Sequence, residues 1–324
     1  MSAQGTRFFK KLASRIGIVF FALAACMLYF QLRKYRLSEI FGAIAEIPSL
    51  HELFAVLACV AEYLILSCYD FLALKYVGKR MAAWKWMLAG MMGFVISNNA
   101  GNAAISGAAI RYRLYTRWRV RAGDIVKMLT FSGITYYLGA SAVLMAGYNF
   151  LPPTNFTENP VSVILLACCC MFAAGYFVLC AVFRNKSFRV GGISFRVPDL
   201  RTAARQMVLG MADSVLAALI LYFLTMHIAP IPFIQFIAVF VVAQTAGIFA
   251  QVPGGIGVFE SVFMLAMPEG INRADLFASL LAFRVIYYLL PLAGIGGLFL
   301  IYERWLKSRM KRWRIFSLPG RRRK

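Results

Sequence analysis

Four ionisable side chains stand inside long apolar stretches of this sequence: Glu62, Asp70, Asp213 and Arg284. Charged groups at membrane depth are costly, so each is a candidate for a binding or transport site. Arg284 needs an acidic partner, which either Glu260 or Asp213 could supply. A purely structural ion pair is the alternative. Glu62 and Asp70 lie two helical turns apart on one face, and we expect Asp70 to lie near the cytoplasmic interface, in contact with water.

The apolar segment Phe233–Pro268 is interrupted near its middle. The break holds a glutamine, a proline and three glycines: Gln251, Pro253, Gly254, Gly255 and Gly257. Proline and glycine disfavour a continuous helix. The following half-helix presents its positive end, where an anionic headgroup could bind. The alternative is a packing kink in which Glu260 simply matches the helix dipole.

A second apolar segment, Trp86–Ile110, carries polar residues at its centre: Ser97, Asn98, Asn99, Asn102 and Ser106. Polar groups at such depth normally face the interior of a helical bundle. Gly101 and Gly107 permit close approach of the backbone. Arg111 and Arg113 follow, where they could either bind an anionic group or anchor the chain among lipid headgroups.

The composition is that of a membrane protein. Of 324 residues, 61% are hydrophobic and 15% are charged, whereas a soluble domain has about 25% charged residues. The net charge of +22 comes from Lys and Arg in short loops and at both termini. That pattern follows the positive-inside rule and suits anionic lipid headgroups. Nucleic acid is not an expected partner, because no soluble basic fold would present the charge.

Neither a metal site nor a cofactor site is predicted. None of the seven Cys forms a C-x-x-C pair, and the two His are far apart in sequence. Cys168, Cys169 and Cys170 are consecutive, so on a helix they point about 100° apart and cannot ligate one ion together. The chain also lacks a P-loop and a dinucleotide fingerprint. We therefore do not expect an enzyme.

The apolar runs predict an all-α polytopic transmembrane helical bundle with about six full spans and two re-entrant hairpins, since a span needs about 20 apolar residues. The first run continues past Cys26 and is read as a span, not a cleaved signal peptide. An interfacial helix is expected at Arg36–Ile47. The predicted spans are Ile16–Leu32, Leu50–Leu74, Asp124–Phe150, Val161–Phe183, Gln206–Ile228 and Asp275–Tyr302.

The order of these segments predicts an inverted-topology repeat. Basic residues flank Trp86–Ile110 on both sides, so that segment enters and leaves from the cytoplasm. Repeat one covers about 16–150 and repeat two about 161–303, within a single membrane domain, 1–324. A basic cytoplasmic tail, 304–324, follows, and both termini are expected in the cytoplasm. The stretch Ala100–Gly107 also resembles Ala246–Gly254.

Two motifs resemble the membrane half of the bacterial lysylphosphatidylglycerol synthase/flippase family, the multiple peptide resistance factor. One runs from Ser97 through Tyr115, and the other from Gln251 to Glu260. The family's last span is matched by Arg284, Tyr287, Tyr288 and Pro291. Ala108 departs from the pattern, because a second glycine is expected after Gly107.

The resemblance implies a bacterial inner-membrane protein with a lipid-flipping fold, similar to stand-alone uncharacterised and hopanoid-associated relatives. Full-length members add further spans and a cytoplasmic aminoacyl-transferase domain. The sequence to Lys324 has neither. We therefore expect a flippase module.

The leading hypothesis is a translocase for phospholipid, with aminoacylated phosphatidylglycerol as one candidate. The alternatives are a transporter of a polyprenyl carrier or a hopanoid, and an accessory subunit of a lipid-modifying enzyme. Expected partners are membrane phospholipids, with a lipid-modifying enzyme and a second copy of the chain left open. The candidate translocation residues are Glu62, Asn98, Asn99, Asn102, Ser106, Arg111, Arg113, Asp213, Gln251, Gly254, Gly255, Gly257, Glu260 and Arg284.

Overall fold

The computed structural model describes residues 42, 45–100, 103–150, 160–229, 231–268 and 270–316. In this part of the chain, five helices are long and apolar enough to cross a membrane. They match five of the predicted spans, so the polytopic all-α bundle is confirmed. The first predicted span, Ile16–Leu32, lies outside the described residues, as does nearly all of the predicted interfacial helix.

The first half of the described chain contains four helices: α3 (Ser49–Tyr76), α4 (Ala83–Ala100), α5 (Ala103–Arg117) and α6 (Ala122–Gly147). The helices α3 and α6 are the spans predicted at Leu50–Leu74 and Asp124–Phe150, each found within a few residues. Between them, α4 and α5 pack against each other, and residues 101–102 between them lie outside the described residues. The segment Trp86–Ile110 therefore forms two helices and not one.

The next segment contains a feature that was not predicted. After α7 (Pro160–Val182), the chain forms a β-hairpin from β1 (Ser187–Val190) and β2 (Ile193–Arg196). The turn is Gly191–Gly192, and both residues have positive φ, 57° and 81°, as a two-residue hairpin turn requires. Apolar and polar residues also alternate, with Phe188 paired to Phe195. These signals lie in the basic stretch 184–205, between two predicted spans, where no strand was predicted.

The helix α8 (Leu200–Thr225) begins six residues before the predicted span at Gln206–Ile228. Its start is set by Asp199, whose Oδ1 accepts a hydrogen bond from the Thr202 N–H at 2.9 Å. A side-chain acceptor at this position satisfies one of the free N–H groups at a helix end.

The second broken segment is α9 (Phe233–Phe249), a 3₁₀ turn (Pro253–Gly255) and α10 (Val258–Ala266). The last predicted span is not one uniform helix. It consists of α11 (Arg273–Arg284), a π-helical turn (Val285–Leu289) and α12 (Leu290–Phe316). Since α12 continues to Phe316, the basic tail expected to start at 304 begins as helix.

The spans α6 and α8 cross with their backbones almost in contact. A β-carbon added to Gly210 would lie 2.3 Å from the carbonyl oxygen of Thr135 and 2.9 Å from the Cα of Gly139. Small residues at helix crossings allow such close packing within membranes. Both helices also contact α3, so α3, α6 and α8 form the centre of the bundle.

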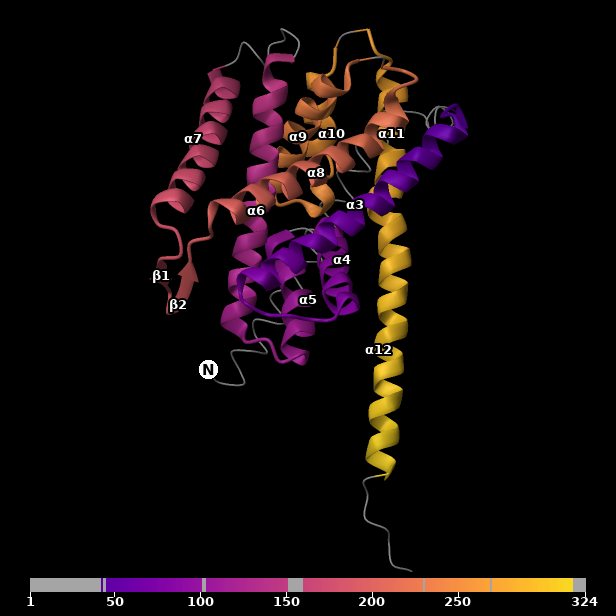
Figure 1. The fold of residues 1–324 in the computed structure, drawn as a ribbon. Coiled ribbons are helices and arrows are strands. Elements are labelled where there is room, and N and C mark those ends of the chain that lie inside the picture. Colours follow the sequence, from indigo (N-terminus) through magenta and orange to yellow (C-terminus); the bar gives the residue numbers. More distant parts are fainter. Residues whose placement is uncertain are drawn as a thin grey trace, which may run out of the picture.

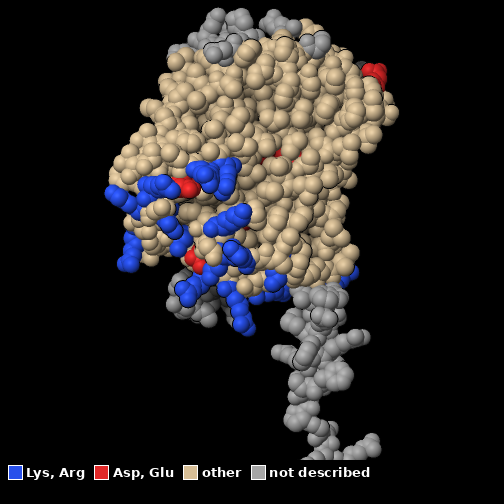
Figure 2. Space-filling model, in the orientation of Figure 1, with Lys and Arg blue, Asp and Glu red and all other residues tan. Residues whose placement is uncertain are grey.

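The two broken segments lie in opposite halves of the molecule (Figure 1): α4 and α5 in the lower half, and α9 and α10 in the upper half. On the face drawn in Figure 2, Lys and Arg gather over the lower half, while the upper half is nearly free of them. This arrangement is the one that an inverted repeat requires. Re-entry from opposite sides of a membrane stays a prediction, as do the exact number of spans and the domain boundaries.

Candidate functional site

The breaks of the two segments meet inside the bundle. A β-carbon on Gly254, in the second break, would lie 3.4 Å from the carbonyl oxygen of Asn98, near the end of α4. The amide of Asn99 donates to the Tyr288 carbonyl oxygen, although the distance is long at 3.3 Å. Residues more than 150 positions apart in the sequence are thus brought together at one place.

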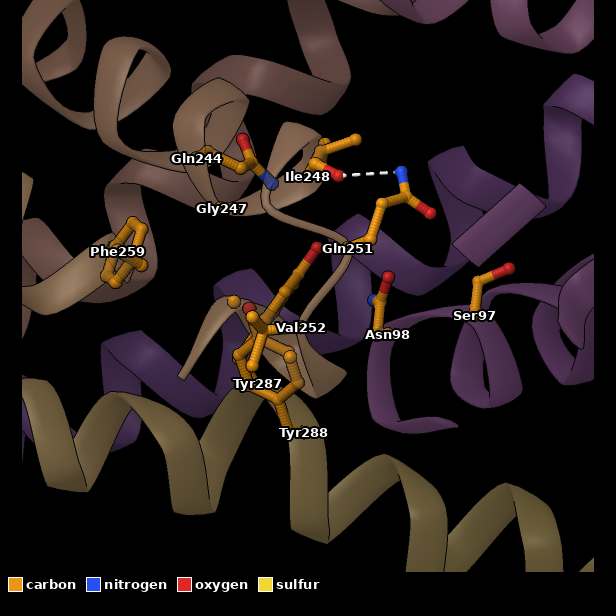
Figure 3. Close-up of a pocket in the computed structure, with 12 residues that line it drawn as sticks. Ser97, Asn98, Gln244, Gly247, Ile248, Gln251, Val252, Phe259, Tyr287 and Tyr288 are labelled. Atoms are coloured by element: carbon orange, nitrogen blue, oxygen red, sulfur yellow. Dashed lines mark hydrogen bonds between the residues drawn. The ribbon is translucent and has the colours of Figure 1, made fainter. Parts of the chain in front are cut away.

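A small cavity of about 70 Å³, mainly apolar but with several polar side chains in its wall, lies where the breaks meet. Ser97 and Asn98 line it from α4, Gln244 and Gln251 from α9 and the residues after it, and Tyr287 from the π-helical turn (Figure 3). The side chain of Gln251 also donates to the Ile248 carbonyl oxygen at 3.0 Å. Amides and hydroxyls at such a position can exchange hydrogen bonds with a polar headgroup.

Arg284 holds the second break in place. Its guanidinium forms an ion pair with Glu260 and donates to the Gly254 carbonyl oxygen at 3.0 Å. It also lies over the Tyr288 ring, 5.3 Å from the centroid. Of the two partners considered from the sequence, Glu260 is therefore the correct one.

The positive end of α10 is already occupied. Glu260 accepts a hydrogen bond from the Gly257 N–H at 2.8 Å while it pairs with Arg284. The anionic group at this helix end is therefore the protein's own carboxylate. A headgroup would bind beside this network, in the cavity, rather than on the helix end that the sequence suggested.

The expectation that Asp70 contacts water is wrong. Its side chain is 2% exposed and lies 3.0 Å from the Arg111 guanidinium, itself 7% exposed. Tyr115 donates to the other carboxylate oxygen at 2.9 Å, and Phe94 faces the guanidinium at 4.4 Å. From the sequence, Arg111 was expected to bind an anionic group or to lie among lipid headgroups. The structure instead directs its side chain from α5 inward, toward α3.

Glu62 does not pair with Asp70 but faces Asp213 on α8, and the two carboxyl groups are within hydrogen-bonding reach. The Tyr69 hydroxyl donates to Asp213 at 2.5 Å. Sequence reasoning had no means to bring these two acids together, because their contact depends on how α3 crosses α8.

A second cavity, of about 280 Å³, connects these groups with the breaks. Asp213, Arg111 and Tyr136 line it, together with Asn98 and Gln244 of the first cavity. Ala108 lines it too, whereas the close packing falls on Gly107, where a β-carbon would stand 1.9 Å from Ser97 Oγ. The departure at Ala108 thus leaves the tight contact intact.

Several predicted residues lie away from this centre or cannot be placed. Asn102 lies outside the described residues. Arg113 is exposed and Ser106 is half-buried. Gly255, by contrast, does line the cavity at the helix breaks, where it packs against Gly247, whose Cα would stand 3.1 Å from an added β-carbon. The sequence missed Tyr69, Tyr115 and Gln244. Tyr69 adjoins Asp70 in the sequence, Tyr115 comes one helical turn after Arg111, and Gln244 is a polar residue inside an apolar segment. These are the signals that could have found them.

Most of the chain matches a known protein family. The family model described as "Lysylphosphatidylglycerol synthase TM region" matches residues 16–294. The uncharacterized protein slr0712 of Synechocystis is 31% identical over 286 residues, which cover 86% of this chain and 88% of that protein. The inner membrane protein YbhN of Escherichia coli is 29% identical, over 85% of this chain and 87% of its own length.

A third relative is much longer than this chain. The phosphatidylglycerol lysyltransferase of Staphylococcus xylosus is 23% identical over 293 residues, which cover 88% of this chain but 33% of that protein. The similarity is therefore confined to about a third of the lysyltransferase.

Proposed function

The chain belongs to the lysylphosphatidylglycerol synthase TM region family, and on that premise we propose that it moves phospholipid across the membrane. The observation that carries the proposal is the cavity at the meeting point of two helix breaks, where the polar side chains of Ser97, Asn98 and Gln244 lie inside a multi-pass bundle. Irregular backbone at membrane depth is tolerated only where protein or a wet cavity surrounds it. Such a place is where a transporter of this kind binds its substrate.

The path we propose keeps headgroup and tails apart. The headgroup passes through the two cavities, which share Ser97, Asn98 and Gln244. The acyl chains stay in the bilayer, against helices whose outer faces carry large exposed apolar side chains, among them Leu57, Val60, Leu298 and Ile301. Transport then requires no chemical change in the lipid.

We further propose that the membrane is the bacterial inner membrane and that both termini are cytoplasmic. The support is the positive-inside rule together with the Lys and Arg side chains over the lower half of the molecule. Labelling single cysteines from each side would test the orientation. Labelling of a cysteine at Arg117 only from the outside would contradict it.

Phospholipid is favoured over the other candidates because of one relative. That relative is named a phosphatidylglycerol lysyltransferase, and this chain matches about a third of it. A polyprenyl carrier and a hopanoid remain as alternative cargoes, and an accessory role beside a lipid-modifying enzyme remains as the alternative function. We propose that the chain makes no aminoacylated lipid itself, since no catalytic constellation was found in its sequence.

The experiment uses the full chain, purified and reconstituted into vesicles of phosphatidylethanolamine and phosphatidylglycerol. Headgroup-labelled phosphatidylglycerol in the inner leaflet should become accessible to dithionite, and the rate should exceed that of empty vesicles. Labelled phosphatidylethanolamine and polyprenyl phosphate in parallel identify the cargo. An accessory subunit would move none of them. Lysyl- or alanyl-phosphatidylglycerol in membranes of a host that lacks these lipids would show an enzyme instead.

A further inference from the structure

Two carboxyl groups lie against each other at the centre of the bundle. Glu62 on α3 is 0% exposed and Asp213 on α8 is 4% exposed, and their side chains are within hydrogen-bonding reach. Two carboxylates that share a buried site cannot both be charged, because like charges repel strongly where water is excluded. The contact therefore requires a proton.

The hydrogen bonds around the pair indicate where that proton resides. Asp213 accepts from the Tyr69 hydroxyl at 2.5 Å, as an ionised carboxylate does. Glu62 has no such close donor among the described residues, and the Tyr287 side chain is the one other group within hydrogen-bonding reach of it. A protonated Glu62 explains both facts, since it is then the donor and Asp213 is the acceptor.

The groups around the pair do not supply a compensating charge. Cys59 comes from α3 itself, Tyr136 from α6 and Tyr287 from the π-helical turn, and all are neutral in their ordinary state. The two arginines inside the described part of the bundle are committed elsewhere, because Arg111 pairs with Asp70 and Arg284 with Glu260. One proton is thus what keeps this site near a single negative charge.

The site also has a route for exchange. Asp213 and Tyr69 line the cavity of about 280 Å³, which shares Gln244 and Tyr287 with the cavity at the helix breaks. The cavity has room for several waters, and Asp213, Asn98 and Gln244 supply polar partners for them in a wall that is otherwise mainly apolar. A headgroup that enters the region shared by the two cavities would bring polar groups and water to Asp213. It would thereby change how strongly the pair binds the proton.

We propose that Glu62 and Asp213 together bind one proton, and that this proton is released and rebound as the headgroup passes. The coupling to lipid rests on the proposed function, whereas the proton site does not. The alternative ligand for the pair is a monovalent metal cation bound between the two carboxylates. The experiment must therefore distinguish a bound proton from a bound metal ion.

The first measurement is infrared difference spectroscopy of the full chain in lipid vesicles near neutral pH, where exposed carboxyl groups are ionised. We expect the carbonyl band of a protonated carboxyl group, shifted in D₂O and lost at alkaline pH. Glu62→Gln should abolish it, because the amide then donates to Asp213. Asp213→Asn should move the band, since Glu62 loses its charged acceptor. Glu52→Gln, the same change on the same helix outside the pair, should leave it unchanged.

The proton site is overturned if Glu62→Gln retains the band, or if Na⁺ at constant pH removes it. The second measurement imposes a pH gradient on the vesicles and follows labelled lipid. One proton per lipid would sustain up to about a tenfold lipid asymmetry per pH unit, and Glu62→Gln should abolish that asymmetry. Lipid movement indifferent to the gradient overturns the coupling. A band without any lipid movement leaves the proton site standing and contradicts the proposed function alone.

Discussion

Gly139 on α6 and Gly210 on α8 are in backbone contact: a β-carbon added to Gly139 would stand 1.9 Å from the Gly210 carbonyl carbon. Nothing but the far helix's backbone occupies that space, so no side chain can move aside. Gly139→Ala should force the two spans apart and lower the stability of the purified protein, since overpacking costs about 1–3 kcal/mol.

The measurement is the thermal unfolding midpoint of the variant in detergent. Gly133→Ala is the matched control, because Gly133 is on the same helix with nothing within 4 Å of its added β-carbon. That control should unfold at the wild-type temperature or slightly above it, as alanine favours a helix by about 1 kcal/mol. Equal effects of the two substitutions would contradict the crossing described here.

Asp70 and Arg111 should depend on each other for stability. Arg111→Ala leaves the Asp70 carboxylate buried without its cation, and such a change costs about 3–5 kcal/mol. Tyr115→Phe removes one hydrogen bond to a charged acceptor and should cost about 1.5–3 kcal/mol. Combining Asp70→Asn with Arg111→Gln should restore part of the loss. Chemical denaturation of wild type, Asp70→Asn, Arg111→Gln and this double variant gives the coupling energy, and strictly additive losses would refute the pair.

Arg284 and Glu260 should affect function more than folded yield. Their network fixes the backbone of Gly254, where the two helix breaks meet. Glu260→Gln and Arg284→Ala should each slow lipid movement while most of the protein remains folded. Lys127→Ala is the control, since its pair with Asp124 is partly exposed and such pairs contribute about 0–1 kcal/mol. Parallel loss of yield and transport would make the pair purely structural.

Asp199 should give the start of α8 a dependence on pH. The hydrogen bonds to Thr202 hold the pKa of Asp199 below its usual range. Because the pKa of Asp199 is lower in the folded protein, the charged carboxylate stabilises the fold at pH values above its pKa in the unfolded chain, about 3.9. This stabilisation is lost as the pH falls through the pKa of Asp199 in the folded protein. Asp199→Ala should cost about 1 kcal/mol at neutral pH. Asp199→Asn keeps the cap without the charge, so its unfolding midpoint should lose this part of the acid dependence.

The sequence predicted the elements of this fold better than their contacts. Apolar length alone located α3 and α6 within a few residues, and the glycines at 254–257 located a break. The β-hairpin was missed although Gly191–Gly192 is a strong turn signal, because a basic stretch between spans was taken for a loop. The π-helical turn after Arg284 has no such signal, since Val285–Leu289 is ordinary helical sequence.

The pairing of charges was harder to predict, for a physical reason. Sequence spacing fixes which residues share a helix face, and it placed Glu62 and Asp70 together on α3. It does not fix the crossing of two helices. The packing of α5 beside α3 places Arg111 against Asp70. The crossing of α8 with α3 places Asp213 against Glu62. For Arg284 the sequence left Glu260 and Asp213 as candidates, and the structure gives Glu260 as the partner.

The central claim is that lipid headgroups pass where the two helix breaks meet, and Gly254 allows the most direct test. Gly254 has φ of +59°, and its added β-carbon would lie 3.1 Å from the Arg284 guanidinium. Gly78 has φ of +69° with nothing within 4 Å of its added β-carbon, so alanine there brings similar backbone strain away from the site. The measurement is the rate at which labelled phosphatidylglycerol is translocated by each variant in vesicles. We expect the Gly78→Ala rate to match wild type and the Gly254→Ala rate to fall at least about tenfold, a change of roughly 1.4 kcal/mol. Equal rates for the two variants, or a wild-type rate no higher than that of empty vesicles, would contradict the account.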